Sequence, residues 1–109
     1  MTIPSFGIRV VRDGDATRIS PAGELDIATT PVLEQAIADA TSAPGAALVL
    51  DLRELTFMDS SGLGALVSLR ERARSGGWSL VLSAPQPPVA MVLRISGLAQ
   101  RLTIIDGTG

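Results

Sequence analysis

The sequence predicts an α/β fold with a mixed, mostly parallel sheet of about five strands and about three to four helices. Short aliphatic runs alternate with segments in which apolar residues recur at helical spacing, and clusters of Gly, Pro, Ser and Thr separate them. The first two strands lie close enough in sequence to form a hairpin, which makes the sheet mixed. The expected order is β-β-α-β-α-β-α-β, with right-handed crossovers between parallel strands.

The chain is expected to open with that hairpin. Apolar residues alternate with Gly7 and Arg9 over residues 6–10, which is the two-residue period of a half-buried strand. Residues 13–15 (Asp-Gly-Asp) predict a turn, and residues 16–19 return as the second strand. Pro21 is expected to weaken the end of that strand, because proline has no N–H to donate to a ladder.

Two helices are expected in the first three quarters of the chain. The first begins at residues 29–31 (Thr-Thr-Pro), with Thr as the cap and Pro in the first turn, and stops at residues 42–45. The second runs from about residue 61 to residue 75 and ends at the glycine pair 76–77.

A third helix is expected to open at the proline pair 87–88 and to end at Gly97. In all three helices, apolar spacing marks the buried face. The residues expected there are Leu33, Ile37 and Ala40, then Leu63, Leu66, Val67 and Ala73, and then Val89, Val92, Leu93 and Ser96.

Short runs rich in aliphatic residues predict three further strands, at residues 46–50, 78–82 and 102–105. The Val and Leu content of the first two is typical of strands covered on both faces, as in a parallel sheet. Sites on such sheets gather at the carboxyl ends of parallel strands. The segment after Leu50 is therefore the first place to look for function.

Composition excludes several functions. The 109 residues include no His, Cys, Lys or Tyr, and all nine basic residues are Arg. A His-dependent catalytic triad, a disulfide and a Schiff-base lysine are therefore ruled out, and the absence of His and Cys argues against zinc. The formal net charge of −2 argues against nucleic-acid binding, which uses a basic face. We expect neither enzymatic activity nor a cofactor.

The chain is expected to reside in the cytoplasm. Its longest apolar run, residues 46–50, is far shorter than a membrane span. Residues 1–10 lack the basic start and apolar stretch of a signal peptide. The absence of cysteine is compatible with a reducing compartment.

The segment 51–65 leaves a strand, crosses a loop and enters the second helix. Asp59, Ser60 and Ser61 stand where an N-cap belongs. Gly62 and Gly64 follow, and each costs about 1 kcal/mol relative to Ala inside a helix, which suggests that something approaches the backbone closely.

Four interpretations of this helix start compete. It is a capped start without further function, a nucleophile elbow, a dinucleotide fingerprint or a phosphorylation switch. The elbow fails because there is no G-x-S-x-G and no His. The fingerprint fails because Val67 stands where the third Gly or Ala is required.

The phosphorylation switch has a physical rationale. A serine at a helix N-terminus on the sheet rim is exposed, and the helix dipole and free N–H groups tolerate a phosphate there. The phosphate adds about −1.5 to −2 charge beside Asp59, which is enough to block a partner without unfolding the domain.

Two segments carry a family resemblance. Residues 57–64 (Phe-Met-Asp-Ser-Ser-Gly-Leu-Gly) resemble the signature of the STAS domain, which is named for sulfate transporters and anti-sigma factor antagonists. Residues 23–26 (Gly-Glu-Leu-Asp) resemble a second signature of that family. The resemblance covers about residues 5–106, so residues 1–109 are expected to form one STAS domain. Its free-standing size resembles the bacterial anti-sigma factor antagonists.

The resemblance implies a phosphorylation site and a set of partners. The family's phosphoacceptor follows the motif Asp, which places it at Ser60 after Asp59, with Asp26 close by. The unphosphorylated family protein binds an anti-sigma factor that is also its serine kinase, and so releases the sigma factor. Phosphorylation ends that binding, and a metal-dependent serine phosphatase restores it. ATP and magnesium belong to the kinase, and neither nucleic acid nor membrane is a direct partner.

The roles of several residues remain open at this stage. Ser61 is favoured as a cap over a second acceptor, and Asp26 is equally a switch residue or a helix-start cap. The residues that follow the serines, Gly62, Leu63 and Gly64, belong to the motif and to the expected partner surface. Met58 and Leu63 are each either core or interface residues, with Leu63 favoured as core, and Met91 is a core or a rim residue. Arg53 and Glu54 are expected to form a solvated loop that flanks the contact face.

Two other functions remain as alternatives. The first is a STAS accessory or structural subunit of a transporter or signalling assembly, in which Ser60 is not phosphorylated. The second is a nucleotide-binding sensor.

Overall fold

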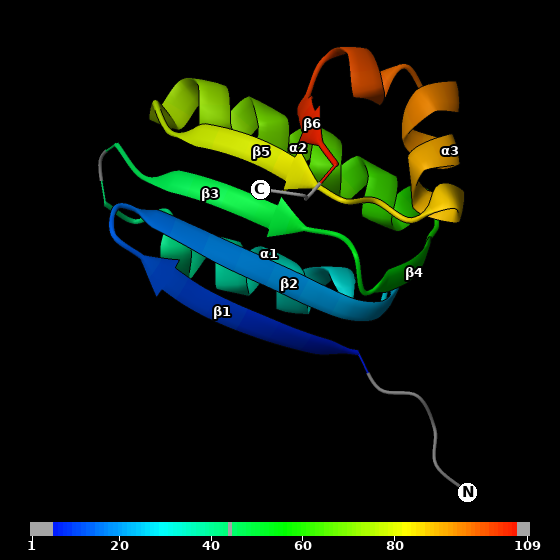
Figure 1. Cartoon of the computed structure of the whole chain (residues 1–109), viewed down its shortest axis with the longest axis horizontal. Coiled ribbons are helices and arrows are strands. Elements are labelled where there is room, and N and C mark those ends of the chain that lie inside the picture. The colour runs from blue at the N-terminus through cyan, green and yellow to red at the C-terminus, as the bar shows by residue number, and fades with distance from the viewer. Residues whose placement is uncertain (1–5, 44, 107–109) are drawn as a thin grey trace, which may run out of the picture.

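The computed structural model describes residues 6–43 and 45–106 (Figure 1). Its elements are β1 (Gly7–Asp13), β2 (Ala16–Leu25), α1 (Thr30–Ala40), β3 (Ala47–Asp51), β4 (Leu55–Met58), α2 (Ser60–Gly76), β5 (Ser79–Ser83), α3 (Pro87–Ile95), the 3-10 helix η1 (Leu98–Gln100) and β6 (Thr103–Ile105). Residues 1–5, which belong to the segment tested for a signal peptide, lie outside the described residues. Pro44, which belongs to the expected end of the first helix, lies outside them as well.

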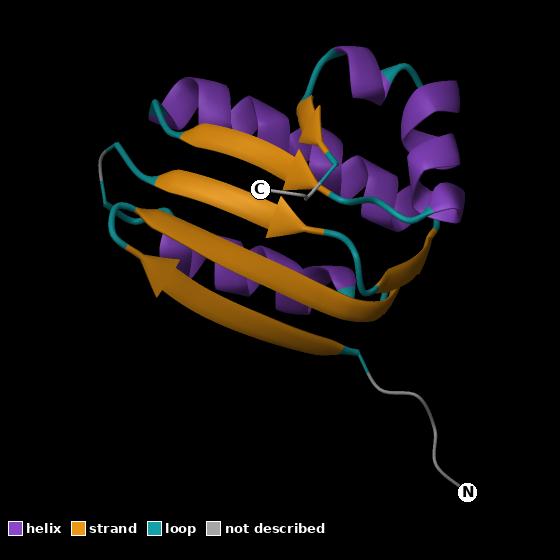
Figure 2. Ribbon diagram, in the orientation of Figure 1, coloured by secondary structure: helices purple, strands orange, loops and turns teal. Residues whose placement is uncertain are grey.

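The sheet has the predicted mixed character. Its strand order is β1-β2-β3-β5-β6, and β4 pairs with β2 beyond the end of β3. Among the described strands, β1 and β2 pair antiparallel, whereas β2–β3, β2–β4, β3–β5 and β5–β6 pair parallel. Helices α1 and α2 lie behind the sheet in the view of Figure 2, so both cover the same face. The predicted α/β class is confirmed.

The core lies between that face and the helices and is almost wholly aliphatic. Burying such side chains stabilises the fold by roughly 1.5–3 kcal/mol each. Its buried members are Ile19, Leu25, Leu33, Ile37, Leu48, Leu50, Leu52, Leu55, Met58, Leu66, Leu69, Leu82, Val89, Leu93 and Leu98. None of the described helices combines the length and the apolar character needed to cross a membrane.

Pro21 does not weaken β2, contrary to the sequence prediction. The strand continues to Leu25, and Pro21 lies opposite Ile8 of β1. On its other side, β2 pairs with β3 only as far as Ile19 and with β4 only from Gly23. Pro21 therefore lies between the part of β2 that pairs with β3 and the part that pairs with β4. At this position β2 has no parallel partner that would need a backbone N–H from it.

Strand β4 was not predicted. Only its first and last residues, Leu55 and Met58, are buried, whereas Thr56 and Phe57 are exposed. Four residues are too few for a recognisable period. Long-range pairing with β2 defines this strand, and the register shifts between Gly23 and Glu24. The 3-10 helix η1 also went unrecognised.

Three expected details of the helices are wrong. Thr29 occupies the N-cap position of α1, but its side chain makes no capping hydrogen bond. Val67 is 45% exposed although it was assigned to the buried stripe of α2. Ser96 is exposed, and its hydroxyl donates to the carbonyl of Leu93.

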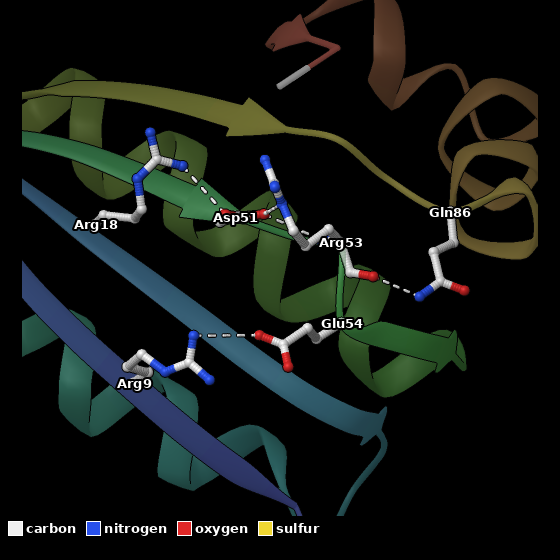
Figure 3. A network of polar contacts seen from close by, with 6 residues as sticks. All are labelled: Arg9, Arg18, Asp51, Arg53, Glu54 and Gln86. Carbon is white, nitrogen blue, oxygen red and sulfur yellow. Dashed lines mark hydrogen bonds and ion pairs between the residues drawn. The ribbon is translucent and has the colours of Figure 1, made fainter. Parts of the chain in front are cut away.

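A polar network fixes the segment that leads into β4 (Figure 3). Asp51 is 6% exposed. Its carboxylate receives Arg18 Nη1 at 3.1 Å and Arg53 Nε at 3.2 Å. The buried charge is thereby paired from both sides, which offsets its desolvation. The network lies on the face of the sheet away from α1 and α2.

Further polar contacts join two more elements, β1 and the start of α3, to that segment. Glu54 pairs with Arg9 of β1 at 3.5 Å, and the side chain of Gln86, at the start of α3, donates to the carbonyl of Arg53. Arg53 and Glu54 are exposed in the loop between β3 and β4, as expected, and their ion pairs also tie this loop to the sheet. They orient the chain just before the strand that carries the site.

Candidate functional site

The site forms where two parallel strands end side by side. Leu25 of β2 pairs with Met58 of β4, and the Asp59 N–H donates to the carbonyl of Leu25 at 3.1 Å. Asp26 and Asp59 are the next residues on each strand. Tertiary pairing therefore places two Asp residues that are 33 positions apart in sequence at neighbouring strand ends.

Asp59 is the N-cap of α2. Its Oδ1 accepts hydrogen bonds from the backbone N–H groups of Ser61 at 2.9 Å and of Gly62 at 3.1 Å. Both groups would otherwise lack an intrahelical partner. The expectation that Ser61 acts as the cap is wrong, because Ser61 donates to the cap. Ser60, the first residue of the helix, is exposed.

Replacing Asp59 with Ala is expected to destabilise the protein by about 1 kcal/mol, because the two first-turn N–H groups lose their acceptor. Urea denaturation followed by circular dichroism measures the change. Asp59→Asn is the matched control, since an Asn side chain retains the capping oxygen. An Asp59→Ala protein as stable as the parent would contradict the capping role.

Asp26 organises the turn that leads into α1. Its Oδ1 accepts from the N–H groups of Ala28 at 2.9 Å and Thr29 at 3.0 Å, and from the Thr29 hydroxyl at 3.1 Å. Its backbone carbonyl accepts from Thr30 N at 2.9 Å. These bonds, the one from the Thr29 backbone foremost, lower the pKa of Asp26 below its ordinary value of 3.8. The expectation that Asp26 serves the helix start agrees with this geometry.

Stability should depend on pH through Asp26. Because its folded-state pKa is lowered, the carboxylate stabilises the fold above its unfolded pKa, and that contribution is lost as the pH falls through the folded pKa. The difference in melting temperature between the parent and Asp26→Asn is therefore expected at neutral pH and should vanish in strong acid. Thermal unfolding across this range measures it. A difference that persists unchanged in acid would exclude the charge as its cause.

The two glycines of the motif have different surroundings. A Cβ on Gly62 would lie 2.6 Å from Met58 Cγ and 3.0 Å from Leu25 Cγ, whereas a Cβ on Gly64 would meet nothing within 4 Å. The close approach expected at Gly62 therefore comes from the protein's own core. Gly64 is exposed, and no described neighbour requires its small size.

Three apolar residues for which the sequence allowed either a core or a surface position have distinct burial in the structure. Met58 is 2% exposed and belongs to the core, and Met91 is 50% exposed and lies at the rim. Leu63 is partly buried and packs against the core, as favoured. Its other side remains accessible and lines a groove beside α2.

Two exposed apolar residues next to the site were missed by the sequence reasoning. Ile27 is 80% exposed and directly follows Asp26, and Phe57 is 47% exposed and lies two residues before Asp59. Their signal in the sequence was an apolar side chain within or beside a signature segment. Only the structure shows that they face solvent. Fold and site together define a small α/β domain that exposes a serine at the start of a helix, flanked by carboxylates and apolar side chains.

Comparisons with known proteins agree with this class. The family model described as "Mlab, STAS domain" matches residues 8–106. The anti-sigma-B factor antagonist of Listeria monocytogenes is 33% identical over 98 residues, which span 90% of this chain and 86% of that protein. The chain belongs to the STAS-domain family, and the resemblance drawn from the two signatures is confirmed.

Solved structures support the same assignment. An anti-sigma factor antagonist from Mycobacterium paratuberculosis superposes with a TM-score of 0.80 at 29% identity, covering 99% of this chain and 92% of that one. The antagonist SpoIIAA in its unphosphorylated form gives a TM-score of 0.70 at 21% identity, over 95% of this chain and 90% of that one, and so shows the shared fold.

Proposed function

We propose that this protein is an anti-sigma factor antagonist controlled by phosphorylation of Ser60. In this proposal the unphosphorylated form binds an anti-sigma factor that is also a serine kinase and thereby releases a sigma factor in the cytoplasm. Phosphorylation ends the binding, and a serine phosphatase restores it. The observation that carries the proposal is the exposed Ser60 at the first position of α2, directly after the Asp59 cap.

The geometry around Ser60 is compatible with a phosphate that leaves the fold intact. The N-cap bonds come from Asp59 and do not use the Ser60 hydroxyl. The helix N-terminus favours negative charge, so a phosphate there does not oppose the helix. It does add about −1.5 to −2 charge beside Asp59. The modification therefore changes the surface more than the stability.

The composition is compatible with a regulator that is phosphorylated by a separate kinase. The chain contains no His or Lys with which to catalyse its own modification. Among the described residues, no three acidic side chains gather closely enough to hold a metal ion. In this proposal the kinase and phosphatase chemistry, with its ATP and metal ions, belongs to the partners.

Phosphate mapping tests the proposal directly. The protein is incubated with its anti-sigma kinase and ATP, and the modified residue is located by mass spectrometry. Ser60 is expected to carry the phosphate, and Ser60→Ala is expected to remain unmodified. A phosphate on Ser61 with Ser60 untouched would overturn the assignment of the acceptor.

The kinase itself can be identified with Ser60→Ala as bait in a pull-down from the source cell, because a protein that cannot be phosphorylated should hold its partner. Recovery of an anti-sigma factor supports the proposal. Recovery of transporter components in its place would favour the accessory-subunit alternative.

A further inference from the structure

The charge of the protein is unevenly distributed along the chain. Residues 1–59 contain nine acidic residues and four Arg, whereas residues 60–109 contain two acidic residues and five Arg. The small net charge of −2 therefore conceals a basic C-terminal half. Three of its Arg residues, Arg70, Arg74 and Arg101, surround one groove.

This groove runs along α2 where the helix faces the segment from the end of α3 through η1, a region visible at the upper right of Figure 1. We call it the α2–η1 groove. A hollow of about 370 Å³ is lined by Leu63, Val67, Arg70, Glu71, Ser96, Gly97, Leu98, Gln100 and Arg101. A second hollow of about 220 Å³, with Arg74, Trp78 and Thr103 among its lining residues, shares Arg70 and Arg101 with the first.

The basic side chains of the groove are only partly neutralised. Arg70 Nη1 lies 2.8 Å from Glu71 Oε1, and Arg74 Nη1 lies 3.6 Å from the same oxygen. Among the residues that the structure describes, the Arg101 guanidinium forms no ion pair. Arg70 and Arg74 therefore share the carboxylate of Glu71, and the charge of Arg101 is not paired with it.

Stabilisation of the α2 C-terminus accounts for only one of the three Arg residues. Arg74 lies in the last turn, where a cation offsets the helix dipole. Arg101 lies outside α2, and its carbonyl accepts from Arg70 Nε at 2.9 Å, which holds Arg70 against η1. The apolar side of the groove is accessible as well, since Val67 is 45% exposed.

We propose that the α2–η1 groove binds an acidic segment of the anti-sigma factor, with apolar side chains of that segment lying against Leu63 and Val67. This inference rests on the proposed function, and it adds a second contact next to the switch at Ser60. Leu63 is one helical turn from Ser60, so one partner can reach both. The apolar lining favours a polypeptide over a nucleic acid, which binds through phosphates and basic side chains.

The groove carries its own spectroscopic reporter. Trp78 is the only tryptophan of the chain and lines the second hollow. A short synthetic peptide of alternating Glu and Leu is titrated into the full-length protein while Trp78 emission is followed. The emission is expected to change in a saturable way that weakens as salt is added. The same peptide with Lys in place of Glu is expected to produce no saturable change.

Charge-reversal variants locate the site. The double variant Arg74→Glu/Arg101→Glu is expected to lower the affinity for the acidic peptide by about tenfold, because two attractive contacts become repulsive. Arg72→Glu makes the same kind of change on an exposed α2 residue that lines none of the described hollows, and it should change the affinity by less than about twofold.

Three outcomes would overturn the inference: no saturable binding, equal losses in the double variant and in Arg72→Glu, or equally tight binding of a single-stranded oligonucleotide. These readouts do not involve Ser60. If Ser60 is phosphorylated and the peptide does not bind, the groove proposal fails and the switch stands. If the peptide binds at the groove and no kinase modifies Ser60, the proposed switch fails on its own.

Discussion

Phosphorylation of Ser60 is expected to lower the affinity for the anti-sigma factor by about 100-fold, which corresponds to about 2.7 kcal/mol. The physical reason is local. The modified side chain would stand beside the carboxylate of Asp59 and close to the strand end that carries Asp26. A partner surface that fits these carboxylates meets additional negative charge and additional volume at the helix start. Isothermal titration calorimetry of both forms measures the difference.

Variants separate the charge from the volume. Ser60→Ala is expected to keep the affinity, Ser60→Asp to lower it, and Ser60→Asn, which is close to Asp in size but neutral, to lie near Ser60→Ala. The loss caused by Asp should shrink as salt is added, since exposed charges are screened. Equal affinities of the Asp and Asn variants would show that an electrostatic switch is not at work.

Replacing Gly62 with Ala is expected to destabilise the fold by up to about 2 kcal/mol. The new Cβ would lie 2.6 Å from Met58 Cγ and 3.0 Å from Leu25 Cγ, and both of these side chains are fully buried. Overpacking of this kind costs about 1–3 kcal/mol, and the helix preference of Ala offsets about 1 kcal/mol of it. Urea denaturation of the purified variant measures the net loss.

Gly64→Ala is the matched control on the same helix. Its Cβ would meet nothing within 4 Å, so the variant is expected to be more stable than the parent by up to about 1 kcal/mol. A Gly64→Ala protein that is more stable and yet binds the anti-sigma factor more weakly would show that this glycine leaves room for the partner. Similar stability changes at both positions would contradict the packing argument.

The fold class and most elements could be predicted because they depend on local patterns. Aliphatic runs identified β3 and β5, apolar spacing identified the helices, and the proline pair at 87–88 opens α3 as expected. The failures share one cause. Whether Pro21 ends a strand depends on which strands flank it, and β4 exists because it pairs with β2.

The features of the site also separate into those set by neighbouring residues in the chain and those set by tertiary contacts. The N-terminus of α2, the exposed serine and the capping region were predicted from residues 59–61, because a helix start depends on the few residues around it. The identity of the cap was decided by the path of the backbone, which places the Asp59 carboxylate over the N–H groups of Ser61 and Gly62. The reason for Gly62 lies in the core side chains of Leu25 and Met58.

By itself, the sequence determined that this is a small α/β domain without the groups for His, Cys or Lys chemistry, with one serine poised at a helix N-terminus. These properties follow from composition and from interactions within a few residues. Only the tertiary structure decided how strand pairing brings Asp26 to that helix start and how Arg53 and Glu54 are tied to the sheet just before it. It also decided that Arg70, Arg74 and Arg101 line two adjoining hollows. Each of these depends on contacts between residues far apart in the chain, and such contacts arise from the packing of strands and helices against one another.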